Sequence, residues 1–133
     1  MLSSTDIDCY QGVHAVYAVT QWWEHLFKGK TQDEAGVIEE EQGMTIARAA
    51  AATRTLEHYI WSTTPSAKRM LRGKLLAPHM DYKANIDARI KSELPLLAAM
   101  TSYLYFGYYP QNMAFVPMCK PVEYVSDFPT WKV

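Results

Sequence analysis

The chain has 133 residues, of which 49% are hydrophobic and 20% charged, so it is long and apolar enough for one folded domain and is not intrinsically disordered. Its formal net charge of −1 lacks the basic surplus of nucleic-acid-binding proteins. No apolar run approaches the roughly 18 residues of a membrane-spanning helix, and the two cysteines, Cys9 and Cys119, provide no disulfide framework. We therefore expect one cytoplasmic domain over residues 1–133, with no nucleic acid and no membrane as partner.

The first half of the chain predicts a strand, a loop and a helix. Residues 13–20 form a short, β-branched apolar run, typical of a strand buried on both faces. Residues 21–30 are expected to form a loop. Residues 33–53 are expected to form a helix, because early carboxylates and late arginines suit the helix dipole. The glutamates at 39–41 are interpreted as a solvated face of this helix, and Gly43 as a point of close approach to a strand.

The second half repeats the alternation. Residues 56–61 predict a second buried strand and residues 66–78 a long basic loop. A helix is expected over 80–93, ended by Pro95, and a third strand over 100–104. After Tyr105, recurrent proline and glycine prevent long regular elements. The order β-α-β-α-β predicts a parallel α/β sheet with right-handed crossovers, whose ligands bind beyond the carboxyl ends of the strands.

Several stretches in this order resemble the NmrA-like family, a branch of the atypical short-chain dehydrogenase/reductase folds. The resemblance covers about residues 8–115 in register, which leaves 116–133 as a tail that we expect to dock on another surface. It implies a partial Rossmann-like three-layer fold with a short parallel sheet. The matching stretches are YAVTQWWE at 17–24, QGMTIARAA at 42–50, HYIWST with PSA at 58–67, PHMDYKA at 78–84 and LYFGYYPQN at 104–112.

The resemblance also implies what this chain lacks. The family's glycine-rich nucleotide turn lies in an N-terminal βαβαβ half, and no G-x-G-x-x-G pattern occurs here. A pyrophosphate needs glycines that let the backbone approach it. We therefore expect a truncated member that binds no cofactor, with NADP bound only if a partner chain supplies the turn. No His, Cys, Asp and Glu set has metal-ligand spacing, so no metal is expected either.

The strand at 13–20 would lose its neighbour if that half were missing. Unpaired apolar strand edges associate with other strands. We therefore expect a homo-oligomer, most simply a two-fold dimer that completes the fold.

Three residues at the start of the second helix are catalytic candidates. His79 and Lys83 are four residues apart and share one helix face. The wider superfamily uses Tyr-x-x-x-Lys, so His79 takes the position of the tyrosine, and the neighbouring Tyr82 is a secondary donor. His79 is expected to act as acid or base, with Lys83 as its electrostatic partner. The alternative is a structural helix start in which Lys83 pairs with backbone or with Asp81.

Eight residues at or after the strand ends are candidates for substrate binding. Hydroxyl groups there can bind a ligand or simply cap helices and turns. Aromatic rings there can wall an apolar pocket or pack against another copy of the chain. The set is Thr20, Trp22, Trp23, Ser62, Thr63, Tyr105, Tyr109 and Asn112.

Three functions remain open. The first is a cofactor-independent acid/base enzyme of the dehydratase, isomerase or cyclase type, acting on a small molecule in specialised metabolism, as the resemblance implies. The second is a non-catalytic regulatory or interaction module of the NmrA-like type. The third is an NAD(P)-dependent oxidoreductase whose cofactor site is completed by another chain.

Overall fold

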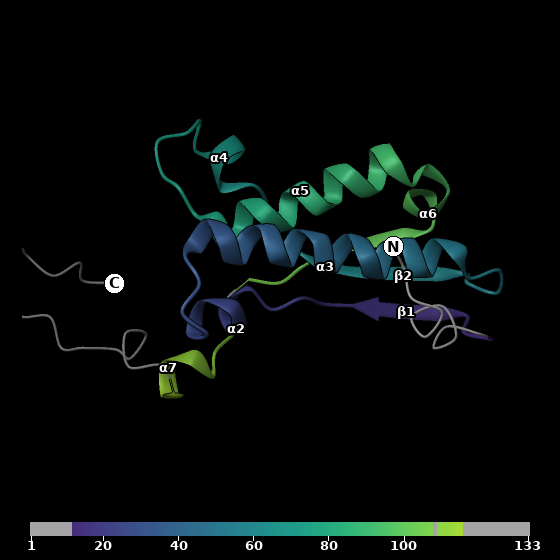
Figure 1. Ribbon diagram of the computed structural model, residues 1–133, viewed down its shortest axis with the longest axis horizontal. Helices are drawn as coiled ribbons and strands as arrows, with labels where there is room; N and C mark the ends of the chain where they lie inside the picture. The colour runs from purple at the N-terminus through teal and green to yellow at the C-terminus, as the bar shows by residue number, and fades with distance from the viewer. Residues whose placement is uncertain (1–11, 108, 116–133) are drawn as a thin grey trace, which may run out of the picture.

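The computed structural model describes residues 12–107 and 109–115 (Figure 1). Its three strands form one parallel sheet in the order β1-β2-β3, which confirms the predicted β-α-β-α-β arrangement. Both cysteines and the predicted docking tail lie outside the described residues. The elements are β1 (Ala15–Ala18), α2 (Trp22–Phe27), α3 (Gln32–Ala52), β2 (His58–Thr63), α4 (Ala67–Met70), α5 (Pro78–Glu93), α6 (Pro95–Ala99), β3 (Thr101–Tyr105) and α7 (Asn112–Phe115).

Helices α3 and α5 pack over the same face of the sheet, as Figure 1 shows. Val16 and Ala18 of β1 lie beside Tyr59 and Trp61 of β2 and point into this core. The helices contribute mainly Met44, Ala47, Ile86 and Ile90. The described residues thus provide a sheet and one helical layer of a Rossmann-like fold.

The opposite face of the sheet carries apolar side chains that the described residues leave exposed. Tyr17 and Val19 are 54% and 53% exposed, and Leu104 and Phe106 on the same face are also exposed. We call these four residues the bare face. The prediction that the first strand is buried on both sides is therefore wrong, because both crossover helices lie on one side of the sheet.

Helix α3 begins at a capping box. Thr31 caps its N-terminus in a capping box with Glu34, which satisfies two backbone N–H groups reciprocally. Gly43 does allow a close approach, although chiefly to a helix: a Cβ added there would lie 2.7 Å from Cδ1 of Ile86 in α5 and 3.2 Å from the Trp61 ring. The small residue therefore sets how near α3 can come to α5.

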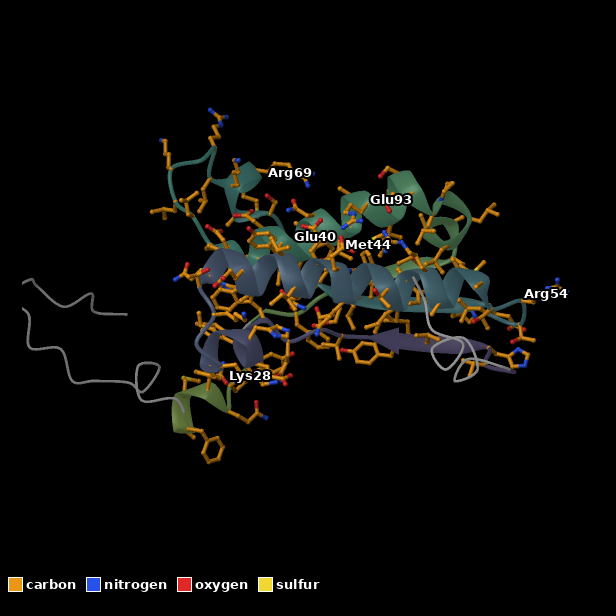
Figure 2. The ribbon with its side chains drawn as sticks, in the orientation of Figure 1. Lys28, Glu40, Met44, Arg54, Arg69 and Glu93 are labelled. Atoms are coloured by element: carbon orange, nitrogen blue, oxygen red, sulfur yellow. The ribbon has the colours of Figure 1, made fainter. Side chains whose placement is uncertain are left out.

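Ion pairs also join the two long helices. The Arg89 guanidinium of α5 donates to Glu40 at 3.0 Å and to Glu41 at 2.6 Å on α3, and to Glu93 on its own helix. Figure 2 shows Glu40 and Met44 where α3 faces α5. This network lies over the core and adds to the apolar packing beneath it.

Two predicted loops contain short helices. Residues 22–27 form α2, because Trp22 turns into the interior, where it is 3% exposed and donates from Nε1 to the Gln32 carbonyl at 3.1 Å. Residues 67–70 form α4, whose N-terminus is capped by Ser66. No helix of the described residues is long and apolar enough to cross a bilayer.

Candidate functional site

A cavity of about 550 Å³ lies beyond the carboxyl ends of the strands. It is bounded by the end of β1, helix α2, the end of β2, the start of α5 and the segment after β3. Figure 1 shows α2 and α7 together at the end toward which β1 points. Seven of the eight predicted substrate-binding residues line it: Thr20, Trp22, Trp23, Ser62, Thr63, Tyr109 and Asn112.

Two pairs of aromatic rings line this cavity, and we call them the aromatic wall. Trp22 and Trp23 meet edge to face, with ring centroids 4.9 Å apart and planes at 86°. Phe106 and Tyr109 stack with centroids 5.9 Å apart. Such a wall favours a flat apolar ligand over a flexible polar one.

His79 lies against this wall. Its ring centroid is 5.6 Å from those of both Trp22 and Trp23. Burial lowers the pKa of His79 below its ordinary value of 6.5, while the charges of Glu39 and Asp81 oppose that shift. At pH 7 the imidazole is therefore neutral and can accept a proton.

Lys83 lies in the same cavity but is fully engaged. Its ammonium donates to the Thr20 carbonyl at 3.0 Å and to the Thr20 hydroxyl at 2.8 Å. It also pairs with Oε1 of Glu39 at 3.0 Å. Two hydrogen bonds and one ion pair thus engage the ammonium, and Lys83 fastens α5 to the end of β1 and to α3.

Glu39 was expected to be part of a solvated helix face, and that prediction is wrong. It is 0% exposed, and its Oε1 accepts from the Thr20 hydroxyl at 2.8 Å and forms the ion pair with Lys83. Its other oxygen, Oε2, has no hydrogen-bond partner among the described atoms. Glu40 and Glu41, the next two residues, face the ion-pair network instead. Glu39 lies one helical turn before Gly43, and both face α5, a spacing that indicates the buried side of α3.

A second buried carboxylate supports the end of β2. Oδ1 of Asp87 accepts from Trp61 Nε1 at 2.8 Å and from the Thr63 hydroxyl at 2.7 Å. Burial raises the pKa of Asp87, and these two hydrogen bonds oppose the shift. The Thr63 hydroxyl is thus occupied by Asp87, whereas Ser62 makes no side-chain hydrogen bond within the described part of the chain.

Two of the predicted site residues, Tyr82 and Tyr105, lie outside the strand-end cavity. The Tyr82 ring packs against Gly36, and its hydroxyl donates to Asp33 at 3.2 Å, away from the cavity. Tyr105 lines a separate cavity of about 330 Å³ beside Asp87 and Lys91. The helix therefore brings His79 and Lys83 together and directs Tyr82 to another side.

A groove of about 860 Å³ runs between the end of β1 and α3. Val37 and Ile46 contribute to its apolar lining, and Glu24 and Glu41 are its charged residues. It contains neither His79 nor Lys83, so it offers less chemistry than the strand-end cavity despite its size.

The turns at the strand ends differ in their glycine content. Residues 19–21 after β1 and residues 64–66 after β2 include no glycine, whereas Gly107 follows β3 and lines the cavity. Within residues 12–107 and 109–115, no three His, Cys, Asp or Glu side chains form a group that could hold a metal ion.

Comparison with known proteins identifies a family. The sequence model of the NmrA-like family matches residues 8–132, which is nearly the whole chain and extends beyond residue 115 into the tail. A search of the curated proteins found no match.

Proposed function

The chain belongs to the NmrA-like family, and from this premise we propose that it binds a small organic molecule in the strand-end cavity and transforms it by acid/base chemistry without a nucleotide. Dehydration, isomerisation and cyclisation fit this description, since each needs only positioned proton donors and acceptors. Specialised metabolism is the setting that the family suggests.

The observation that carries the proposal is the environment of His79. Its imidazole lines the cavity, is kept neutral by burial and makes no side-chain hydrogen bond to the described residues. A base of this kind can remove a proton from a carbon next to a carbonyl group. The hydroxyl of Ser62, in the same cavity, is available to donate to the carbonyl oxygen.

In this proposal Lys83 positions other groups, whereas its spacing to His79 predicts an electrostatic partner in catalysis. Its ammonium is engaged by two hydrogen bonds to Thr20 and by the ion pair with Glu39, so it holds the walls of the site together. We therefore treat His79 as the catalytic residue and Lys83 as a positioning residue.

Hydrogen–deuterium exchange provides a direct test that needs no knowledge of the natural substrate. The probe is 2-acetylnaphthalene, a flat ketone whose methyl protons can be removed by a base. In D2O, the loss of its methyl signal in proton NMR should be faster with the protein than in buffer. Substitution His79→Asn should return the rate to that of buffer.

His58→Asn is the matched control, because His58 begins β2 at the opposite end of the sheet. This variant should keep the full exchange rate. Equal exchange by His79→Asn and the unmodified chain would refute the assignment of His79. Binding of the ketone without any exchange would favour a non-catalytic binding module. Tight binding of NADPH, measured by quenching of tryptophan fluorescence, would favour the oxidoreductase.

A further inference from the structure

The positive charge in the cavity is neutralised from within the protein. Lys83 is the cationic side chain among the described cavity residues, and Glu39 lies 3.0 Å from its ammonium. The Thr20 carbonyl and hydroxyl take its other two donors. The pair therefore presents no net charge to a ligand.

An anionic ligand cannot recruit Lys83 without a penalty. If the ammonium turned toward the ligand, it would leave Glu39, which is fully buried and whose Oε2 already has no partner among the described atoms. Breaking a buried ion pair in this way costs about 3–5 kcal/mol, because an uncompensated charge remains in the interior.

The other sources of positive potential are also weak. The imidazole of His79 is neutral at pH 7. The N-terminus of α5, the positive end of that helix, carries Asp81 in its first turn, and the Asp81 carboxylate accepts from the Ser66 hydroxyl and the Lys68 amide. Asp81 therefore offsets the helix dipole near the cavity.

We propose that the strand-end cavity selects an uncharged, flat aromatic molecule and discriminates against the matching carboxylate or phosphate. The Glu39–Lys83 pair is the specificity determinant, and the aromatic wall holds the ring system. This inference concerns the same site as the proposed function and rests on the assignment of that site, but it makes no use of catalysis by His79.

Two probes with the same ring and nearly the same shape test the selectivity. 2-Naphthamide is neutral, whereas 2-naphthoate is an anion at pH 7. Equilibrium dialysis with the full chain should show that the amide binds at least about tenfold more tightly, a difference of about 1.4 kcal/mol. Equal or tighter binding of the naphthoate overturns the proposal, as does failure of the amide to bind at 1 mM.

The substitution Glu39→Gln tests the determinant itself. It keeps the size and shape of the side chain beside Lys83 but removes its charge, which leaves a net positive site. Affinity for naphthoate should rise by about tenfold, because the charge of Lys83 is no longer neutralised by Glu39, while affinity for the amide stays within about twofold.

Glu41→Gln is the matched control. It removes the same charge from the same helix, but Glu41 faces Arg89 and Arg48 outside the cavity. Its amide-to-naphthoate preference should equal that of the unmodified chain. An equal change in both variants would mean that only the overall charge matters and would refute the role of Glu39. If Glu39→Gln does not fold, the comparison of the two probes on the unmodified chain still decides the proposal.

These outcomes separate the inference from the proposed function. Selective binding of the amide without deuterium exchange would support the selectivity and refute the catalysis. Exchange that depends on His79, combined with a preference for naphthoate, would support the catalysis and refute the selectivity.

Discussion

The imidazole of His79 lies beside two indole rings in the strand-end cavity, and this position controls its protonation. Removal from water disfavours the imidazolium more than the carboxylates of Glu39 and Asp81 favour it, so the pKa of His79 is lowered. The lowered pKa affects how the exchange rate and the free energy of unfolding each depend on pH.

Exchange of the ketone probe should increase with pH as His79 loses its proton and then level off below neutrality. An NMR titration of the histidine Cε1 protons, assigned with His79→Asn, should place the pKa of His79 below 6.5. An exchange rate that still climbs through pH 7–8 would show that another group is the base.

His79 should also make the folded state sensitive to acid. A group whose pKa is lowered on folding binds a proton more readily in the unfolded chain, so its contribution to stability is present above pH 6.5 and is lost as the pH falls through the folded pKa. In urea melts, the unmodified chain should therefore lose more stability between pH 7.5 and pH 5 than His79→Asn does. A variant that loses as much would indicate that other groups dominate the acid response.

Asp87 should stabilise the end of β2 through its two hydrogen bonds. Replacing it with alanine leaves the Trp61 indole N–H and the Thr63 hydroxyl without an acceptor, and both residues are almost fully buried. We expect Asp87→Ala to lower the free energy of unfolding by about 2–4 kcal/mol. Asp87→Asn keeps an accepting oxygen and avoids burying a charge, so its loss should be about 1 kcal/mol. Urea melts of both variants at pH 7 measure the difference, and equal losses would contradict this account.

His79 and Glu39 show how far local sequence can place a side chain. The spacing of His79 and Lys83 predicts that they share one face, because residues four apart lie on the same side of a helix. The sequence predicts a solvated Glu39 because a glutamate within a run of three ordinarily faces water, and only the packing of α5 against α3 shows that its side chain is buried. A buried charge depends on a partner 44 positions away in the chain, which local composition does not reveal.

At the level of elements, the contact between α3 and α5 depends on Gly43. Gly43→Ala should gain about 1 kcal/mol in helix propensity but lose more through the clash with Ile86 and Trp61. We expect a net loss of about 1–2 kcal/mol in the free energy of unfolding. Adding Ile86→Val removes the nearest atom, Cδ1, so the double variant should be more stable than the sum of the single losses predicts.

Gly107→Ala provides the control for this substitution. A Cβ at Gly107 would meet no atom within 4 Å, so its stability should stay within about 0.5 kcal/mol of the original. A gain in stability from Gly43→Ala would show that the two helices can move apart and that the close approach is not required.

The predicted elements agree with the structure where the sequence carries a long periodic or capped signal. Helix α3 differs from its predicted range by one residue at each end, although its last turn contains none of the basic residues on which the prediction relied. The sequence predicts a loop where α2 forms, because a helix of six residues has too few turns to show a periodic pattern. Its formation depends on burying Trp22 and on a hydrogen bond to Gln32, both of which are tertiary.

At the level of the whole molecule, the described sheet has two unpaired edges and a bare face. β1 and β3 each pair only with β2 among the described strands, and Tyr17 of β1 and Leu104 of β3 expose apolar surface on the bare face. Unpaired edges and apolar patches of this kind favour association. We propose a second copy of the chain as the partner, consistent with the two-fold dimer expected from the sequence.

Sedimentation velocity at micromolar concentration should therefore give the mass of a dimer. Tyr17→Lys should shift the distribution toward monomer, because it places a charge on the bare face. Leu96→Lys is the control: Leu96 is as apolar and still more exposed, but it lies on α6, away from that face. A monomeric mass for the unmodified chain would refute the proposal.

The order of strands and helices was predictable from sequence, because alternating buried strands and helices have few compatible topologies. The exposure of one sheet face was not, since a run such as residues 13–20 is apolar whichever side is covered. Which side is covered depends on the path of both crossovers, and that is a property of the complete chain fold.

The cavity and the core use different stretches of β2 and α5. Ser62 and His79 lie in the cavity, at the end of β2 and the start of α5, whereas the core residues Tyr59 and Ile86 lie farther from that edge along the same two elements. Replacing the former should therefore alter what is recognised without undoing the scaffold. Because these residues are separate, ligand specificity can change while the fold is retained. Natural evolution or a small randomised library could each produce such a change.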